Sequence, residues 1–387
     1  MSRSRDRFRI LYLIDDLTLG GAQRALLSQA AALDRERFEV HVASLELRPG
    51  GPLAQSFREA GIAVHTLTTV GEPLGLAPLR LRALVTSLRP DVVHTHLARA
   101  GIAGRIVARS RRVPHVVSTL HHLSDWTERR LHPMRILDRA TLPLADRICA
   151  VSDAVRDAVA SMSPALRERT VTLRNGVVLE DFQIPEGGRA AARARLGLAP
   201  ADFVVGTVGR LEPSKGIETL LRAAAKASTR APMLQLLIVG DGSDRWRLEE
   251  LTRALQISSW VTFTGSRADV PRFLAAADLF ACPSRSEGLG LAAIEALAAG
   301  LPVLASHAGG LPEIVEDRVS GRLLPPDAPE EWADAIAHAA THPESLEPWR
   351  RAAARRAHAF SIESSAAALE RLYGTLETPE VGQRDAA

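Results

Sequence analysis

Residues 282–313, CPSRSEGLGLAAIEALAAGLPVLASHAGGLPE, hold two glutamates, Glu287 and Glu295, around a glycine-containing turn and a short apolar helix. If both were helical, their spacing would leave the carboxylates about 80° apart and about 12 Å apart along the axis, too far to meet on one ligand group. We therefore expect Glu287 in the turn and Glu295 inside the helix, where they reach different parts of one elongated ligand. The first free amides of the helix lie between them and suit a diphosphate.

Strand and helix alternate through the rest of the chain. Apolar runs such as FRILYLID and FEVHVASL alternate with stretches of helical period such as AQRALLSQAAAL, which predicts a parallel sheet covered by helices on both faces. The alternation of predicted strands and helices stops at 183–201, a stretch with glycine, proline and a basic run, and it resumes with FVVGTVGR. In such sheets, ligands bind at the carboxyl ends of the strands.

The predicted fold class is therefore α/β, with two tandem Rossmann-like, doubly wound domains that face each other across a cleft. We place the N-terminal, acceptor-side domain at 1–183 and the C-terminal, ligand-binding domain at 184–360. The final helix, at 361–377, is expected to pack back on the first domain.

Composition favours a globular enzyme. The chain has 387 residues, of which 46% are hydrophobic and 24% charged, as in ordinary soluble domains. No apolar run approaches the length of a bilayer span, and the apolar core near the N-terminus is too short for a signal peptide, so we expect a cytoplasmic protein. Cys149 and Cys282 have no paired spacing, which favours packed thiols over a disulfide or a metal site.

Charge is divided unevenly along the sequence. Residues 1–183 contain 26 basic and 19 acidic residues, and the remainder contains 22 and 26. The basic half predicts an anionic partner, either the inner face of a membrane, contacted peripherally, or a phosphate-bearing acceptor. A solvated arginine-rich surface is the equal alternative. Aromatic residues interleaved with basic ones are scarce, which argues against a nucleic-acid partner.

The tandem domains, GRLEPSKG at 209–216 and SEGLGLAAIEALAAGLPVLAS at 286–306 resemble glycosyltransferase family 4, the retaining nucleotide-sugar transferases of GT-B fold. The resemblance covers residues 8–376 and implies that Arg210 and Lys215 hold the donor diphosphate. Two cations at a strand end can neutralise a diphosphate and stabilise the charge that grows on it as the sugar leaves. Lysine is rare in this chain, with two lysines against 46 arginines, so composition alone does not explain Lys215.

The same resemblance assigns roles around the two glutamates. It implies that Glu295 accepts the hydroxyl protons of the donor ribose and that Glu287 lies near the transferred sugar. Gly288, Leu289 and Gly290 would offer backbone N–H groups to the diphosphate at the start of the helix.

In the first domain, Gly20 and Gly21 follow the first strand directly. The family has a glycine pair here that faces the donor phosphates, and the alternative is a plain strand-to-helix turn. The resemblance also implies that a histidine at the end of STLHH touches the transferred sugar. His121 is our candidate, and His122 is the alternative.

Two further clusters could suggest a metal, but we predict none. His94 and His96 share one strand face without a nearby third ligand, so strand-end packing is favoured. Asp15 and Asp16 resemble the metal-binding acidic pair of the other glycosyltransferase fold, but their place after the first strand of a GT-B domain argues against that role.

The predicted function is that of a hexosyltransferase-type glycosyltransferase. It would move a sugar from a UDP- or GDP-linked donor to a glycan or lipid-linked acceptor, as in polysaccharide or lipopolysaccharide biosynthesis, with retention as the resemblance implies. A GT-B epimerase and a non-catalytic nucleotide-sugar-binding protein are the alternatives. GRLEPSKG lacks the ending of a Walker A loop and VGDGSDR lacks the third glycine of a dinucleotide fingerprint, which argues against a P-loop NTPase and an NAD enzyme.

Overall fold

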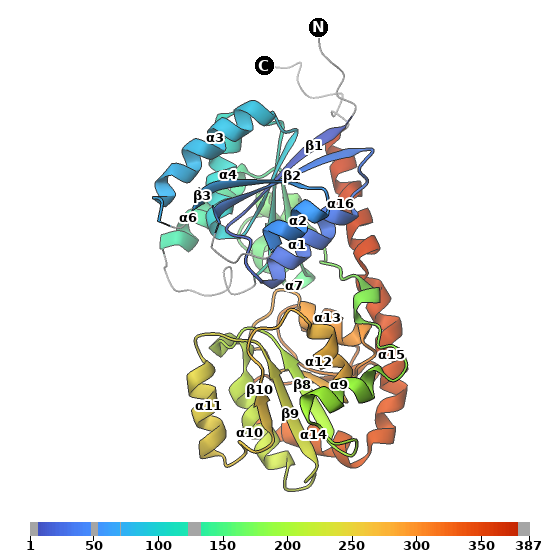
Figure 1. Ribbon diagram of the computed structural model, residues 1–387. Coiled ribbons are helices and arrows are strands. Elements are labelled where there is room, and N and C mark those ends of the chain that lie inside the picture. The colour runs from blue at the N-terminus through green and yellow to red at the C-terminus, as the bar shows by residue number, and fades with distance from the viewer. Residues whose placement is uncertain (1–6, 48–52, 70, 123–132, 378–387) are drawn as a thin grey trace. The chain divides into compact units, whose positions relative to one another are not determined.

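The computed structural model of the chain describes residues 7–47, 53–69, 71–122 and 133–377. These residues form two compact units, each a parallel sheet covered by helices (Figure 1). Unit 1 comprises Met1–Gly176 and Ile362–Ala387, and unit 2 comprises Val177–Ser361. In the described part of the chain, no helix combines the length and the apolar character that crossing a bilayer requires.

The sheet of unit 1 has seven strands in the order β3-β2-β1-β4-β5-β6-β7, and its neighbouring strands pair in parallel. The strands are β1 (Phe8–Ile14), β2 (Phe38–Leu47), β3 (Ala63–Thr69), β4 (Val92–His96), β5 (His115–Leu120), β6 (Arg147–Ala150) and β7 (Thr170–Thr172). The parallel sheet predicted from the alternating pattern is confirmed.

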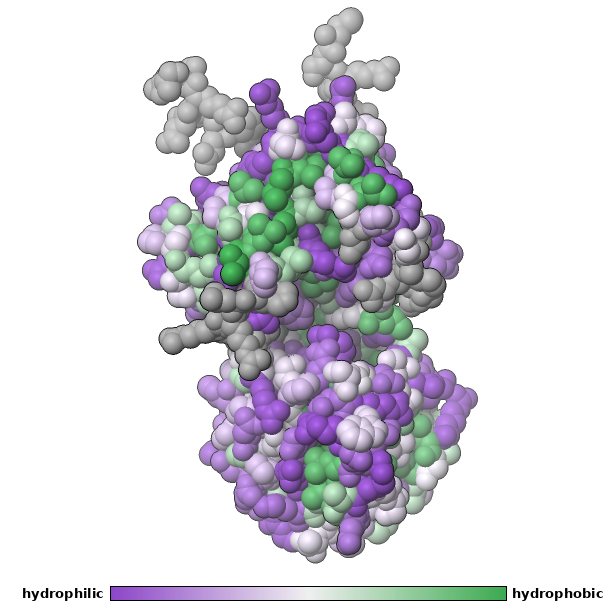
Figure 2. Space-filling view, turned by 90° about the vertical axis from the view of Figure 1, so that its left-hand side faces the viewer, coloured by the Kyte–Doolittle hydropathy of each residue, from purple (hydrophilic) through white to green (hydrophobic). Residues whose placement is uncertain are grey.

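Helices cover both faces of this sheet. They are α1 (Gly21–Ala32), α2 (Leu53–Glu59), α3 (Ala77–Leu88), α4 (Ala98–Ser110), α6 (Pro133–Thr141), α7 (Asp153–Ala160), α8 (Pro164–Arg169) and α16 (Ile362–Glu377). Successive strand residues point to opposite faces. Tyr12 therefore packs with α1, α2 and α16, whereas Leu13 packs with α3 and α4. On the face of unit 1 that carries α3 and α6, exposed apolar residues gather (Figure 2).

The C-terminal helix α16 is buried against the first sheet. The hydroxyl of Tyr373 donates to the hydroxyl of Tyr12 at 2.9 Å and lies 2.6 Å from Nδ1 of His94. On the neighbouring helix, Gln29 donates to Ser365 at 2.8 Å. Because buried polar groups must be paired, this network fixes one position of α16 on unit 1.

The sheet of unit 2 has six strands in the order β10-β9-β8-β11-β12-β13, again parallel. The strands are β8 (Phe203–Val208), β9 (Leu234–Val239), β10 (Val261–Phe263), β11 (Leu279–Cys282), β12 (Val303–Ser306) and β13 (Gly321–Leu324). The helices are α9 (Gly188–Leu196), α10 (Ile217–Ala227), α11 (Arg245–Ala254), α12 (Val270–Ala276), α13 (Leu291–Ala298), α14 (Pro329–Thr341) and α15 (Glu347–Ala357).

The unit boundary lies between Gly176 and Val177, seven residues before the predicted one. The basic, glycine-rich run at 183–201 contains helix α9, which packs inside unit 2. Arg193 of α9 donates to the carbonyl oxygens of Ala276 at 3.1 Å and Asp202 at 3.0 Å. The run has the composition of a linker, but its hydrogen-bond acceptors include groups more than 80 residues away in the sequence.

In both sheets the strand order reverses at one point, between β1 and β4 in unit 1 and between β8 and β11 in unit 2. Loops that leave neighbouring strands in opposite directions open a crevice at the carboxyl ends of such a pair. Gly20, Lys215, Glu287 and His121 lie in segments that follow these strands or their neighbour β5.

Candidate functional site

In unit 2, the loop after β8 carries two cations. Lys215 ends a short 3₁₀ turn, Pro213–Lys215, and its side chain is 22% exposed. Arg210 is 59% exposed, and its guanidinium donates to Oε1 of Glu212 at 2.6 Å. The loop therefore presents one largely buried ammonium and one solvent-exposed guanidinium.

The loop after β11 supplies the partner of that ammonium. Nζ of Lys215 donates to Oε1 of Glu287 at 2.6 Å, and the hydroxyl of Ser284 donates to the same oxygen at 2.9 Å. Burial lowers the pKa of Lys215, but the carboxylate of Glu287 outweighs burial and raises it above its usual value. Lys215 is therefore a fixed cation at neutral pH.

Two glycines allow these loops to approach each other closely. Gly216 and Gly309 have positive φ angles, of 65° and 55°. A Cβ atom at Gly216 would lie 2.0 Å from the carbonyl oxygen of Pro283, and one at Gly309 would lie 2.0 Å from that of Glu287. Any side chain at either position would push the backbone of the Glu287 loop away.

The start of helix α13 completes this part of the site. Gly290 is its N-cap, and the first intrahelical hydrogen bond joins the N–H of Ala293 to the oxygen of Gly290 at 2.9 Å. Gly288 and Leu289 precede it in the buried turn, and half-buried Glu295 lies in the second helical turn. The expected placement, with Glu287 in the turn and Glu295 in the helix, is confirmed, whereas their roles toward a ligand stay predictions.

Ser284 and Arg285 belong to the site but were not singled out in the sequence. The N–H of Arg285 donates to the oxygen of Ser214 at 2.8 Å, and its guanidinium donates to Pro213 at 2.7 Å and to Asp327 at 2.7 Å. These bonds hold the two loops together. The partners of Arg285 are distant in sequence, so no local pattern could have indicated it, whereas Ser284 lies only three residues from its partner Glu287.

Cys282 lies at the end of β11, beneath the ion pair. It is a buried free thiol, as is Cys149 in unit 1. Burial raises the pKa of each thiol to about 12, so neither forms a thiolate at neutral pH. The prediction of packed thiols is confirmed.

In unit 1, Gly20 and Gly21 begin helix α1 directly after the loop that leaves β1. Gly20 is its N-cap in an extended conformation, and Gly21 is its first residue. Oδ1 of Asp16 accepts hydrogen bonds from the N–H of Thr18 at 3.1 Å and from the amide of Gln23 at 3.1 Å. Asp16 therefore orders the turn in which the two glycines lie.

Asp15 caps helix α4. Its Oδ1 accepts the N–H of Ala100 at 2.7 Å in the first turn of α4, and its Oδ2 accepts from Arg99 at 3.2 Å. A carboxylate is stabilised at a helix N-terminus. Within the described ranges, no group of three or more His, Cys, Asp or Glu side chains is placed to hold a metal ion.

His121 follows β5 and contacts His96 at the end of β4. Nδ1 of His96 and Nε2 of His121 are 2.9 Å apart. His94 bonds through both ring nitrogens, to Tyr373 at 2.6 Å and to Thr119 at 2.7 Å, which is the expected packing role. Burial, followed by the neighbouring imidazoles, holds the pKa of His121 well below its usual range. Its ring is therefore neutral at physiological pH.

The contact between His96 and His121 has a preferred direction. Nε2 of His96 is buried and has no hydrogen-bond partner among the described residues. A buried N–H without a partner is rarer than a buried acceptor without one, which favours the tautomer of His96 with its proton on Nδ1. His96 then donates to Nε2 of His121. His121 keeps its own proton on Nδ1 and can donate it to a ligand.

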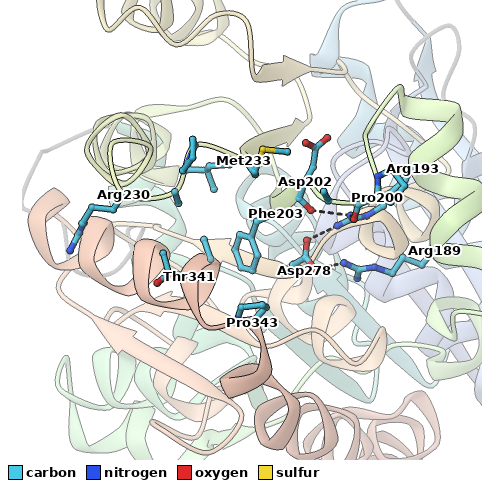
Figure 3. Close-up of a pocket in the computed structure, with 15 residues that line it drawn as sticks. Arg189, Arg193, Pro200, Asp202, Phe203, Arg230, Met233, Asp278, Thr341 and Pro343 are labelled. Atoms are coloured by element: carbon cyan, nitrogen blue, oxygen red, sulfur yellow. Dashed lines mark hydrogen bonds and ion pairs between the residues drawn. The ribbon is translucent and has the colours of Figure 1, made fainter.

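A cavity of about 350 Å³ lies at the opposite edge of the unit 2 sheet (Figure 3). Phe203 and Leu234 line it at the amino ends of β8 and β9, together with Asp278, which directly precedes β11. Nη2 of Arg193 donates to Asp278 at 2.5 Å, and Arg189 binds its other oxygen. These arginines tie α9 to the sheet, and the cavity lies apart from Lys215 and Glu287.

Two protein families match most of the chain. Residues 19–181 match the family described as Glycosyltransferase Family 4, and residues 188–356 match the one described as Glycosyl transferases group 1.

Proteins similar to this chain over most of its length include D-inositol 3-phosphate glycosyltransferases. A D-inositol 3-phosphate glycosyltransferase of Saccharomonospora viridis is 36% identical over 305 residues, which cover 73% of this chain and 69% of that protein. The enzyme of the same name from Mycobacterium tuberculosis is 36% identical over 297 residues, covering 72% of this chain and 60% of that protein. The chain thus matches between 60% and 69% of the length of these relatives.

Among solved structures, HepE of Anabaena in complex with UDP and glucose has a TM-score of 0.83 at 26% identity. The match covers 95% of this chain and all of that chain. HepE therefore shares the fold of this chain.

Proposed function

The chain belongs to glycosyltransferase family 4, and we propose that it transfers a sugar from a UDP-linked donor to an acceptor hydroxyl with retention of anomeric configuration. The observation that carries the proposal is the ion pair of Lys215 and Glu287 at the switch point of the unit 2 sheet. A buried, permanently charged ammonium at that point suits a diphosphate.

On this proposal, unit 2 binds the donor. Arg210 and Lys215 neutralise the diphosphate, the amides at the start of α13 bind its oxygens, and Glu295 accepts from the ribose hydroxyls. Glu287 lies near the sugar. Because the HepE neighbour was solved with UDP, we favour uracil as the donor base over guanine.

The proposed reaction proceeds on one face of the sugar. The bond from the anomeric carbon to the phosphate oxygen breaks, and a bond to the acceptor oxygen forms on the same side. The acceptor proton passes to the departing phosphate oxygen, and UDP leaves. Lys215 and Arg210 stabilise the charge that grows on the diphosphate, and the neutral His121 donates a hydrogen bond to the sugar from Nδ1.

The acceptor is proposed to carry negative charge. Residues 1–183 are basic, with 26 basic against 19 acidic residues, and the D-inositol 3-phosphate glycosyltransferases act, as their name states, on a phosphate-bearing acceptor. A phosphorylated polyol or a lipid-linked glycan at the inner face of the cytoplasmic membrane would meet this requirement. An enzyme that acts on a lipid-linked acceptor needs a surface that binds the membrane as well as a site that binds the donor.

The donor assignment is tested by thermal shift with UDP, GDP and a panel of their sugars, because a bound ligand raises the melting temperature by mass action. Product analysis with the stabilising donor then separates the alternatives. Transfer releases UDP together with a glycosylated acceptor of retained configuration, an epimerase releases a free epimerised sugar, and a binding protein yields no product. We expect transfer that persists after metal chelation, because the proposed chemistry uses no metal.

A further inference from the structure

Helix α6 of unit 1 reverses the usual burial preference. Its buried residues are polar, Asp138 and Thr141, whereas Met134, Ile136 and Leu137 are 38%, 51% and 48% exposed. Large apolar side chains normally lie inside a protein and carboxylates outside. A helix with its apolar residues in solvent therefore needs a specific interaction on its buried side that stabilises this orientation.

A buried arginine on the neighbouring helix holds it. Arg105 of α4 is 1% exposed and forms an ion pair with Asp138. Its Nη2 also donates to the carbonyl oxygen of Asp138 at 3.0 Å and to the hydroxyl of Thr141 at 2.8 Å. Because breaking a buried pair costs several kcal/mol, these bonds fix which side of α6 faces α4. The exposure of its apolar residues follows from that anchoring.

The neighbouring helices extend the apolar surface. Leu79 of α3 is 64% exposed and Ile106 of α4 is 44% exposed. Helix α4 packs against both α3 and α6, and Figure 2 shows apolar residues gathered on this face of unit 1. We call the five exposed residues the apolar face; they are Leu79, Ile106, Met134, Ile136 and Leu137.

The same helices are strongly basic. Helices α3, α4 and α6 contain seven arginines, and Arg111 and Arg112 directly follow α4, whereas Asp138 is the only acid in the three helices. Acids from neighbouring segments pair with Arg80, Arg99 and Arg109; they are Glu72, Asp15, Glu46 and Asp146. With these included, nine arginines stand against five acids, so the layer keeps an excess of positive charge.

We propose that the apolar face and its arginines dock unit 1 on an anionic lipid bilayer. Apolar side chains that enter the interface beside basic residues that bind lipid headgroups form a known mode of peripheral attachment. The inference rests on the proposed function, because docking on a membrane would bring the enzyme to an acceptor that is lipid-linked or lies near the membrane.

The charge distinguishes the bilayer from other occupants. A second copy of the chain, docked through the same face, would bring two basic surfaces together, and like charges across an interface are unfavourable. A soluble anion would satisfy the arginines but leave the apolar face in water. An anionic lipid surface with an apolar interior matches both features.

Vesicle co-sedimentation of the full chain tests the proposal. We expect binding to phosphatidylcholine vesicles that contain phosphatidylglycerol, little binding to phosphatidylcholine alone, and a decrease with salt. The double substitution Ile136→Ser, Leu137→Ser should weaken binding about tenfold, because two apolar side chains leave the interface. Arg82→Gln, which removes one exposed arginine, should weaken it about fivefold.

Met233→Ser is the matched control, since Met233 is 48% exposed, like Leu137, but belongs to unit 2; it should bind like the unchanged chain. Equal binding to both vesicle types, or unchanged binding of the double variant, would overturn the proposal, as would a dimer that the double variant loses.

The melting shift with UDP, measured on the same samples, separates the proposed function from the membrane-docking inference. Vesicle binding without a UDP shift contradicts the proposed function alone, and a UDP shift without vesicle binding contradicts this inference alone.

Discussion

Nζ of Lys215 lies 2.6 Å from Oε1 of Glu287, and the hydroxyl of Ser284 donates to the same oxygen at 2.9 Å. The ion pair joins the loops that leave β8 and β11, two neighbouring strands. A carboxylate in this place positions the ammonium without removing its charge. The protein thereby holds a cation at the point where a sheet of this topology binds a phosphate.

Glu295 is expected to determine how tightly the nucleotide binds. Glu295→Ala should raise the Kd for UDP roughly tenfold to a hundredfold, because hydrogen bonds from the ribose hydroxyls to a carboxylate are lost. Isothermal titration calorimetry measures this change. Glu250→Ala is the control, since Glu250 is an exposed helical glutamate of unit 2. If both variants bind UDP like the unchanged chain, Glu295 does not contact the ribose.

Gly309 and Gly300 form a matched pair of left-handed glycines, with φ angles of 55° and 72°. A Cβ at Gly309 would collide with the carbonyl oxygen of Glu287, whereas a Cβ at Gly300 would meet open space. Gly300→Ala should cost about 1 kcal/mol of unfolding free energy. Gly309→Ala should cost about 3 kcal/mol and also weaken UDP binding. Urea denaturation and calorimetry test both; equal losses would mean that the close approach is unimportant.

His96 is expected to act through His121 as a positioning residue. His96→Leu should lower kcat about tenfold with little change in the Kd for UDP, because the His121 ring loses the donor that fixes its tautomer. His96→Asn places an amide N–H near the former Nδ1 and should restore most of the activity. Steady-state kinetics of the two variants provide the test. Equal activity of the Leu and Asn variants would show that the hydrogen bond has no role.

The buried histidines make the stability of unit 1 depend on pH. Burial, followed by His121, lowers the pKa of His94 to about 3, whereas in the unfolded chain it is about 6.5. As pH falls below 6.5 the unfolded state binds the proton first, so the stability that is present at neutral pH is lost. For His94 this loss is about 2 kcal/mol between pH 8 and pH 5.

Urea denaturation at the two pH values measures the effect. His94→Asn should reduce the pH-dependent loss by that amount, and the exposed His338→Asn should leave it unchanged. Identical losses in the unchanged chain and the His94 variant would contradict a neutral, buried His94.

The sequence was sufficient for the parallel sheets and for the placement of Glu287 and Glu295, because periodicity and glycine turns are local signals. It did not indicate that Arg193 would donate to Asp278, and so the run at 183–201 had the composition of a linker although it contains helix α9 of unit 2. The orientation of α6 was likewise hidden, because it depends on Arg105 in another helix. Contacts between distant segments leave no periodic pattern to read.

The most direct test of the central claim is Lys215→Ala with a saturating UDP-sugar. Charge on the leaving diphosphate peaks in the transition state, so kcat should fall roughly a hundredfold or more, and the Kd for the donor should rise far less. Lys226→Ala is the control, because Lys226 is the only other lysine and its exposed side chain pairs with Glu330. A large loss of kcat confined to the Lys215 variant is the predicted result, and an unchanged kcat in that variant would contradict the account.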